Sequence, residues 1–146
     1  MRSLSLLCLV ASALIVGCAP PKPSPIEGAW KLAHATWVHR DSLVGEYPGM
    51  WVGGGMKMWT RDHFAFVGRY KSDTTNFDSF GGGMYKLDGD RYEEIIQYHI
   101  ATGMVGDTVK MLLEIKADTL TQTWPVGTNG QIDRKNFNEE KYVRLE

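Results

Sequence analysis

The sequence predicts an all-β fold, a small eight-stranded antiparallel up-and-down barrel that follows a cleaved signal peptide. After residue 25, short apolar–polar alternations recur every 10–15 residues, whereas no stretch keeps a 3.6-residue apolar period for three turns. Most links between alternating segments are short enough for hairpins, which make neighbouring strands antiparallel. Eight such strands lose their edges by closing into a barrel. A β-sandwich is the main alternative, because it needs the same alternation of inward and outward residues.

We expect the strands at residues 28–39, 54–60, 63–71, 80–87, 90–99, 107–117, 119–125 and 137–145. In the strand around Met111, apolar residues at every second position alternate with mostly charged ones, so one face points inward. Turn residues such as Asp88-Gly89 and Asn129-Gly130 accept positive φ and separate the strands. Two glycine runs, 53–55 and 81–83, indicate a sharp bend or the close approach of another backbone.

Length and charge limit the possible classes of function. The chain has 146 residues, which suits one domain better than two. Its 16 Lys and Arg against 17 Asp and Glu give a net charge of -1, so no basic surplus exists to neutralise a run of phosphates. Nucleic acid is therefore not an expected partner. We expect a single barrel domain over residues 26–146.

Residues 1–17 have the layout of a bacterial export signal. A basic start precedes an uncharged apolar stretch from Leu4 to Val16, and a small residue stands before Cys18. The stretch is too short for a permanent span, which needs about 20 apolar residues. Residues 15–18 resemble a lipobox, which implies that the signal is removed and that Cys18 becomes the acylated, palmitate-bearing first residue. An ordinary signal peptide, with Cys18 as an incidental thiol, is the alternative.

Residues 18–25 are the expected tether between lipid and barrel. They contain four Pro, which favour an extended, solvated chain. Position 19 is Ala where an Asp would retain a lipoprotein in the inner membrane of enteric bacteria. We therefore expect a lipid anchor in the outer membrane of a bacterial cell envelope, on its periplasmic face. The membrane is one expected partner, and the oligomeric state is left open.

The ends of the domain carry a resemblance to a known family. Gly28-Ala29-Trp30 in the first strand and Arg144 in the last resemble the bacterial lipocalin-like domains of the calycin superfamily, and so do residues 60–66 and 81–94. The resemblance implies that Trp30 lies across the closed end of the barrel and that Arg144 stacks on its indole, a cation–π contact. The Thr-Asp-Tyr type motif of the larger secreted lipocalins is missing. Transport of retinoids or odorants is therefore not implied.

Aromatic and polar residues at inward positions suggest a ligand site in the barrel mouth, apolar with a few placed polar groups. The ligand-binding candidates are Trp37, Phe66, Tyr70, Tyr85, Glu94, Tyr98, Met111, Gln122 and Trp124. Period 2 places Glu94 inside with Tyr98, where a carboxylate needs a partner. It either pairs with a basic residue such as Arg69 or Lys31, lies at a solvated rim, or anchors a ligand. Residues 49–52 could form a flap over the open end or a buried loop.

Two readings of function follow. The first is a non-enzymatic, lipid-anchored barrel that binds a small apolar or amphipathic ligand. The alternative is a filled barrel without a cavity, which serves as an interaction module for a protein or envelope partner. An enzyme is not expected, since no Gly-x-Ser-x-Gly elbow is present and the four His lack the spacing of a helical metal site. We therefore expect no catalytic residues, no metal and no cofactor.

Overall fold

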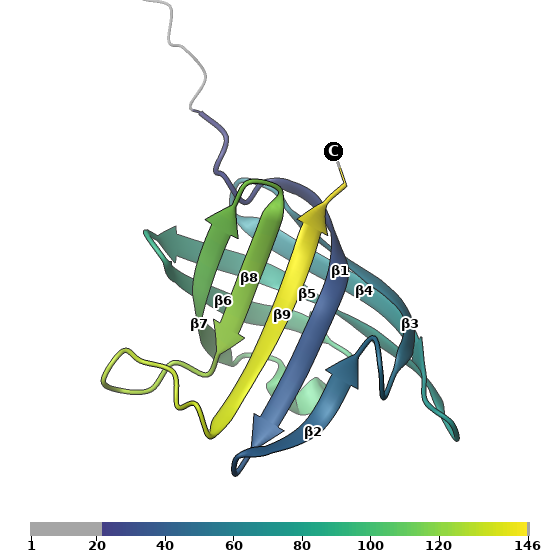
Figure 1. The fold of residues 1–146 in the computed structure, drawn as a ribbon. Coiled ribbons are helices and arrows are strands. Elements are labelled where there is room, and N and C mark those ends of the chain that lie inside the picture. The colour runs from purple at the N-terminus through teal and green to yellow at the C-terminus, as the bar shows by residue number, and fades with distance from the viewer. Residues whose placement is uncertain (1–21, 146) are drawn as a thin grey trace, which may run out of the picture.

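The alternating segments pair into one antiparallel sheet that closes on itself (Figure 1). The computed structural model describes residues 22–145; the predicted signal segment 1–17 and Cys18 lie outside the described residues. Within that range the strands are β1 (Gly28–His39), β2 (Ser42–Tyr47), β3 (Val52–Trp59), β4 (His63–Lys71), β5 (Asn76–Asp88), β6 (Arg91–His99), β7 (Thr108–Lys116), β8 (Thr119–Trp124) and β9 (Asn136–Arg144). A single 3-10 turn, η1 (Thr102–Met104), follows β6 in this part of the chain. No helix of the described range is long and apolar enough to cross a membrane.

Closure comes from the pairing of β1 with β9, the first and last strands. From β3 to β9 each strand pairs with the next along the chain, as hairpin connections require. On its other side β1 is shared, because Gly28–Lys31 pair with β3 and Ala35–His39 pair with β2. The fold is therefore a closed eight-stranded barrel with β2 as one additional strand. The predicted barrel is confirmed, and the sandwich is not formed.

The extra strand β2 is the main difference from the predicted strands. No strand was predicted between residues 39 and 54, and the apolar residues of 42–47 do not alternate with polar ones. Leu43 and Val44 are adjacent and both exposed, and only Gly45 and Tyr47 at the end of the strand are buried. β2 pairs with β1 alone. Its strand character comes from that pairing rather than from a hydrophobic face.

Each glycine run contains a position where the neighbouring strand approaches too closely for a side chain. A Cβ on Gly83 would lie 2.0 Å from the carbonyl oxygen of Ile95 on β6, and one on Gly53 would lie 2.1 Å from that of Arg69 on β4. Gly53 also has φ of +138°, which side chains rarely adopt. Next to Gly83 the β5–β6 register shifts, so that Gly82 faces Tyr98 while Gly83 faces Ile96. Gln97 is thus the extra residue of a β-bulge.

One end of the barrel is closed by Trp30, whose side chain is fully buried. Its indole N–H donates to the carbonyl of Ile26 at 2.9 Å, and its ring meets that of Trp59 edge-on at 6.4 Å. The guanidinium carbon of Arg144 lies 4.1 Å from the indole centroid. Arg144 also donates to the carbonyls of Glu27 and Pro25, at 2.9 and 2.7 Å. The incoming chain is thereby held across this end, beside the C-terminus (Figure 1).

Candidate functional site

A cavity of about 240 Å³ lies inside the barrel, and each of the eight barrel strands contributes at least one residue to its wall. The wall is largely apolar, with aromatic rings from four strands and a few polar side chains, which is the usual character of a small-molecule site. Six of the nine sequence-predicted candidates line it: Trp37, Phe66, Tyr70, Glu94, Met111 and Trp124. The interior is therefore not filled completely by side chains.

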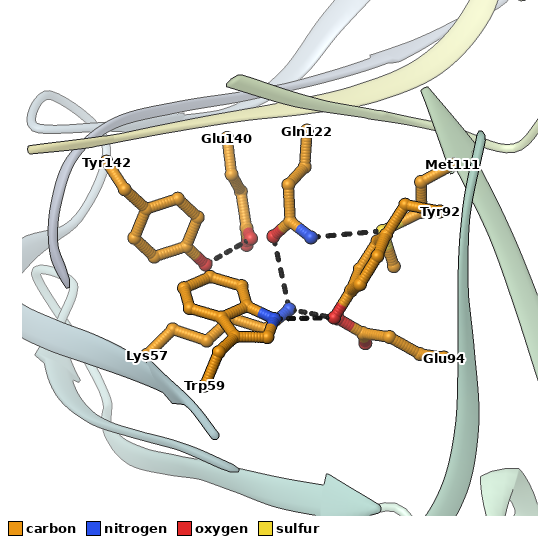
Figure 2. A network of polar contacts seen from close by, with 8 residues as sticks. All are labelled: Lys57, Trp59, Tyr92, Glu94, Met111, Gln122, Glu140 and Tyr142. Carbon is orange, nitrogen blue, oxygen red and sulfur yellow. Dashed lines mark hydrogen bonds and ion pairs between the residues drawn. The ribbon is translucent and has the colours of Figure 1, made fainter. Parts of the chain in front are cut away.

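Glu94 points into the barrel, as the period of β6 predicted, and forms an ion pair with Lys57 of β3 (Figure 2). Both residues are only 3% exposed. The expected partners Arg69 and Lys31 were wrong. Arg69 pairs instead with Asp78 at 2.6 Å on the exposed face of the barrel, and Lys31 is itself exposed.

A network of hydrogen bonds surrounds this ion pair. The Lys57 ammonium also donates to the Gln122 amide oxygen at 3.1 Å. The hydroxyl of Tyr92 donates to Glu94 at 2.9 Å and accepts from the indole N–H of Trp59 at 2.7 Å. Within residues 22–145, every buried side-chain nitrogen and oxygen has a hydrogen-bond partner. Such a saturated network holds its charges at fixed positions beside the cavity.

Aromatic rings surround the ammonium group of Lys57 as well. Its nitrogen lies 5.1 Å from the ring centroid of Phe64, 5.3 Å from that of Trp59 and 5.7 Å from that of Phe66. These are cation–π distances. The interior of this barrel thus already accommodates one ammonium group, between a carboxylate, an amide oxygen and several ring faces.

Sequence reasoning did not identify Lys57 as an interior residue. The signal was present, because Lys57 stands two residues before the buried Trp59 and therefore shares its face of the strand. The sequence nevertheless favours a surface position for Lys57, because lysine is rarely buried without a partner. The partner lies on a strand 37 residues further along the chain, and only the closure of the barrel brings the two together.

Glu140 of β9 is the second residue that sequence reasoning missed. Its carboxylate lines the cavity and accepts a hydrogen bond from the hydroxyl of Tyr142 at 2.5 Å (Figure 2). Burial raises the pKa of Glu140 above its usual value, although the nearby Lys57 ammonium opposes that effect. Burial also raises the pKa of two nearby tyrosines, and the negative charge of Glu140 is the second cause at both. The pKa of Tyr142 is raised well above its usual value, and that of Tyr70 is raised to about 12. Both hydroxyls therefore remain protonated donors at neutral pH.

Gln122 and Tyr85 are buried but do not line the cavity. Gln122 belongs to the hydrogen-bond network around the ion pair of Lys57 and Glu94, and its amide nitrogen lies 3.5 Å from the sulfur of Met111. The hydroxyl of Tyr85 donates to the carbonyl of Thr60 at 2.8 Å, towards the β3–β4 turn. These two candidates therefore support the interior rather than face the space in it.

The prediction that Tyr98 faces the interior was wrong. Its side chain is 71% exposed, on the outer face of the barrel. Ile96 still points inward, in the alternation that begins at Tyr92. The bulge at Gln97 shifts this alternation by one residue, so Tyr98 points outward. By the same shift His99 faces the cavity, where its ring meets that of Phe66 at 5.7 Å.

The segment expected as either a flap or a buried loop, residues 49–52, follows β2 and ends in Val52, the first residue of β3. Trp51 is half-buried and packs edge-on against Trp37 of the cavity wall at 4.5 Å. It also contacts Phe77 at 5.6 Å. Met50 is half exposed. The segment thus places one aromatic ring at the cavity wall and leaves its neighbour in solvent.

No group of three or more His, Cys, Asp or Glu in the described part of the chain is arranged to hold a metal ion. A scan against protein-family models finds no match, and the chain matches no curated protein. What the site does is therefore inferred from its own geometry.

Proposed function

We propose that this chain is a lipocalin-like lipoprotein of the bacterial cell envelope, which holds a small apolar or amphipathic ligand in its barrel without transforming it chemically. The cavity of about 240 Å³ is the observation that carries the proposal. It is lined by aromatic and aliphatic side chains together with a few polar ones, among them Lys57, Glu94 and Glu140. A barrel that serves only as an interaction module needs no such cavity, so the cavity favours ligand binding.

Ligand retention is tested by native mass spectrometry of residues 19–146 purified from an exporting bacterial host. We expect an additional mass that is present under gentle ionisation and lost on denaturation. The cavity-filling variant Val109→Phe places a ring in the wall of this space. We expect it to lose the additional mass, because the larger side chain occupies the volume of the ligand.

Val143→Phe is the matched control, since it adds the same ring on a partly exposed position of β9. It should retain the ligand. No additional mass in the unmodified protein, together with no uptake of a fluorescent fatty-acid or amine probe, would contradict ligand binding and favour the interaction module.

The lipid anchor is a separate part of the proposal, supported by the lipobox-like residues 15–18. We expect Cys18→Ser to abolish labelling by a palmitate analogue and to release the protein into the soluble fraction. Cys8→Ser should leave both unchanged, because Cys8 lies in the segment that is removed. Continued membrane association of Cys18→Ser would contradict lipid anchoring and would leave the cavity proposal untouched.

A further inference from the structure

We propose that the cavity selects a small organic cation, an amine whose ammonium group meets the carboxylate of Glu140. This inference rests on the proposed function, because it names the class of ligand that the same cavity takes. It follows from the charges on the cavity wall, from the rings beside them and from what an anionic ligand would meet there.

The cavity wall carries more carboxylates than ammonium groups. Lys57, Glu94 and Glu140 line the cavity, so its wall carries one ammonium and two carboxylates when all three are ionised. His99 also lines the cavity, and its Nδ1 accepts a hydrogen bond from the backbone N–H of Ala101 at 3.0 Å. The Lys57 ammonium already donates hydrogen bonds to the Glu94 carboxylate and to the amide oxygen of Gln122. One negative charge is therefore not balanced by a positive charge from the wall.

Glu140 carries that charge. Within residues 22–145 its one side-chain hydrogen bond comes from Tyr142, and none of its oxygens lies within ion-pair distance of a basic side chain. A partly buried carboxylate without a cation beside it is destabilising, and burial accordingly raises the pKa of Glu140. A ligand ammonium in the adjoining space would supply both the missing charge and a charge-assisted hydrogen bond.

The apolar part of the wall also suits a cation. Lys57 shows that an ammonium is stable in this interior beside the rings of Phe64, Trp59 and Phe66. Phe66 is shared with the cavity wall, to which Trp37 and Trp124 add two indoles. Indole faces give the strongest cation–π contacts among the side chains. A ligand cation would thus be surrounded much as the protein's own lysine is.

An anionic ligand would meet the opposite arrangement. Its carboxylate would face both Glu94 and Glu140, and the Lys57 ammonium that could attract it already donates to two acceptors. Like charges at close range in a poorly solvated interior repel strongly. The cavity therefore discriminates against fatty acids and other carboxylates that would enter with the acid group inward.

The test compares three probes of nearly equal shape, 2-phenylethylamine, 2-phenylethanol and phenylacetate, by calorimetric titration of the unmodified protein at a single pH near neutrality. We expect the amine to bind at least about tenfold more tightly than the alcohol, and the acid to bind most weakly. This comparison needs no variant. Equal binding of amine and acid would overturn the inference.

Glu140→Gln then assigns the selectivity to one residue, since the amide keeps an acceptor for Tyr142 and loses only the charge. We expect the affinity for the amine to fall to that for the alcohol, with the alcohol unaffected. Glu139→Gln is the matched control, because Glu139 pairs with Lys141 at 3.2 Å and does not line the cavity. It should leave the affinities for all three probes unchanged.

The two proposals fail in different ways. If the alcohol binds and Val109→Phe abolishes its binding, but the amine has no advantage, ligand binding stands and the cation inference is wrong. If no probe binds and no additional mass is retained, both are wrong. An amine preference that survives Glu140→Gln would also overturn the assignment to Glu140.

Discussion

Lys57→Met is expected to lower the free energy of unfolding by about 3–5 kcal/mol, as measured by urea denaturation at neutral pH. The methionine fills much of the space of the lysine stem, so the principal loss is the positive charge. Glu94 would then be a buried carboxylate with Tyr92 as its remaining partner, and Glu140 would lose the ammonium that opposes the rise of its pKa. Removing one member of a buried ion pair costs more than the pair contributes, because the other charge is left uncompensated.

Two controls separate this electrostatic loss from a packing loss. A carboxyl whose pKa is raised by folding destabilises the native state when it ionises, so stability returns as the pH falls through the raised pKa. Burial raises the pKa of Glu140, and the loss in Lys57→Met should therefore shrink as the pH is lowered from neutrality through that raised pKa. The double variant Lys57→Met/Glu94→Gln should recover most of the loss at neutral pH. A double variant as unstable as the single one would show that the lysine stem, rather than the charge, is what matters.

Much of the fold was predictable because burial imposes a period of two on each barrel strand. β7 shows this clearly: Met111 and Leu113 are buried, and Lys110 and Glu114 are exposed. The prediction failed where local pairing replaces burial. β2 exposes Leu43 and Val44, and its strand conformation comes from its pairing with Ala35–His39 of β1.

The site was less predictable than the fold, for two physical reasons. A β-bulge changes which residues face inward without a strong local signal, and the one at Gln97 exchanged Tyr98 for His99 on the cavity wall. Charge pairing across the barrel joins residues that are distant in sequence. Alternation predicted that Glu94 is buried, but it could not identify Lys57 as the partner, because any inward position on the other strands satisfies the same rule.

Trp30→Ala is expected to cost about 3–5 kcal/mol, the range for truncation of a large buried side chain. The indole is fully buried, donates to the carbonyl of Ile26 and packs against Trp59. Its removal would leave a cavity at the closed end that the surrounding strands can fill only by separating from their partners. The measurement is chemical denaturation, and a loss under about 1 kcal/mol would show that Trp30 does not close the barrel.

The contact between Arg144 and Trp30 contributes a separable part of that cost. Arg144→Met keeps an apolar stem over the indole but loses the charge and the hydrogen bonds to Glu27 and Pro25. In a double-mutant cycle, the effect of Arg144→Met is measured once with Trp30 present and once in Trp30→Ala. The loss of the hydrogen bonds to Glu27 and Pro25 contributes to both measurements and cancels, so the difference between them is the cation–π coupling. We expect that coupling to be about 0.5–2 kcal/mol. Independent, additive losses would mean that Arg144 stabilises the closed end by fastening the incoming chain, with its position over the indole contributing nothing of its own.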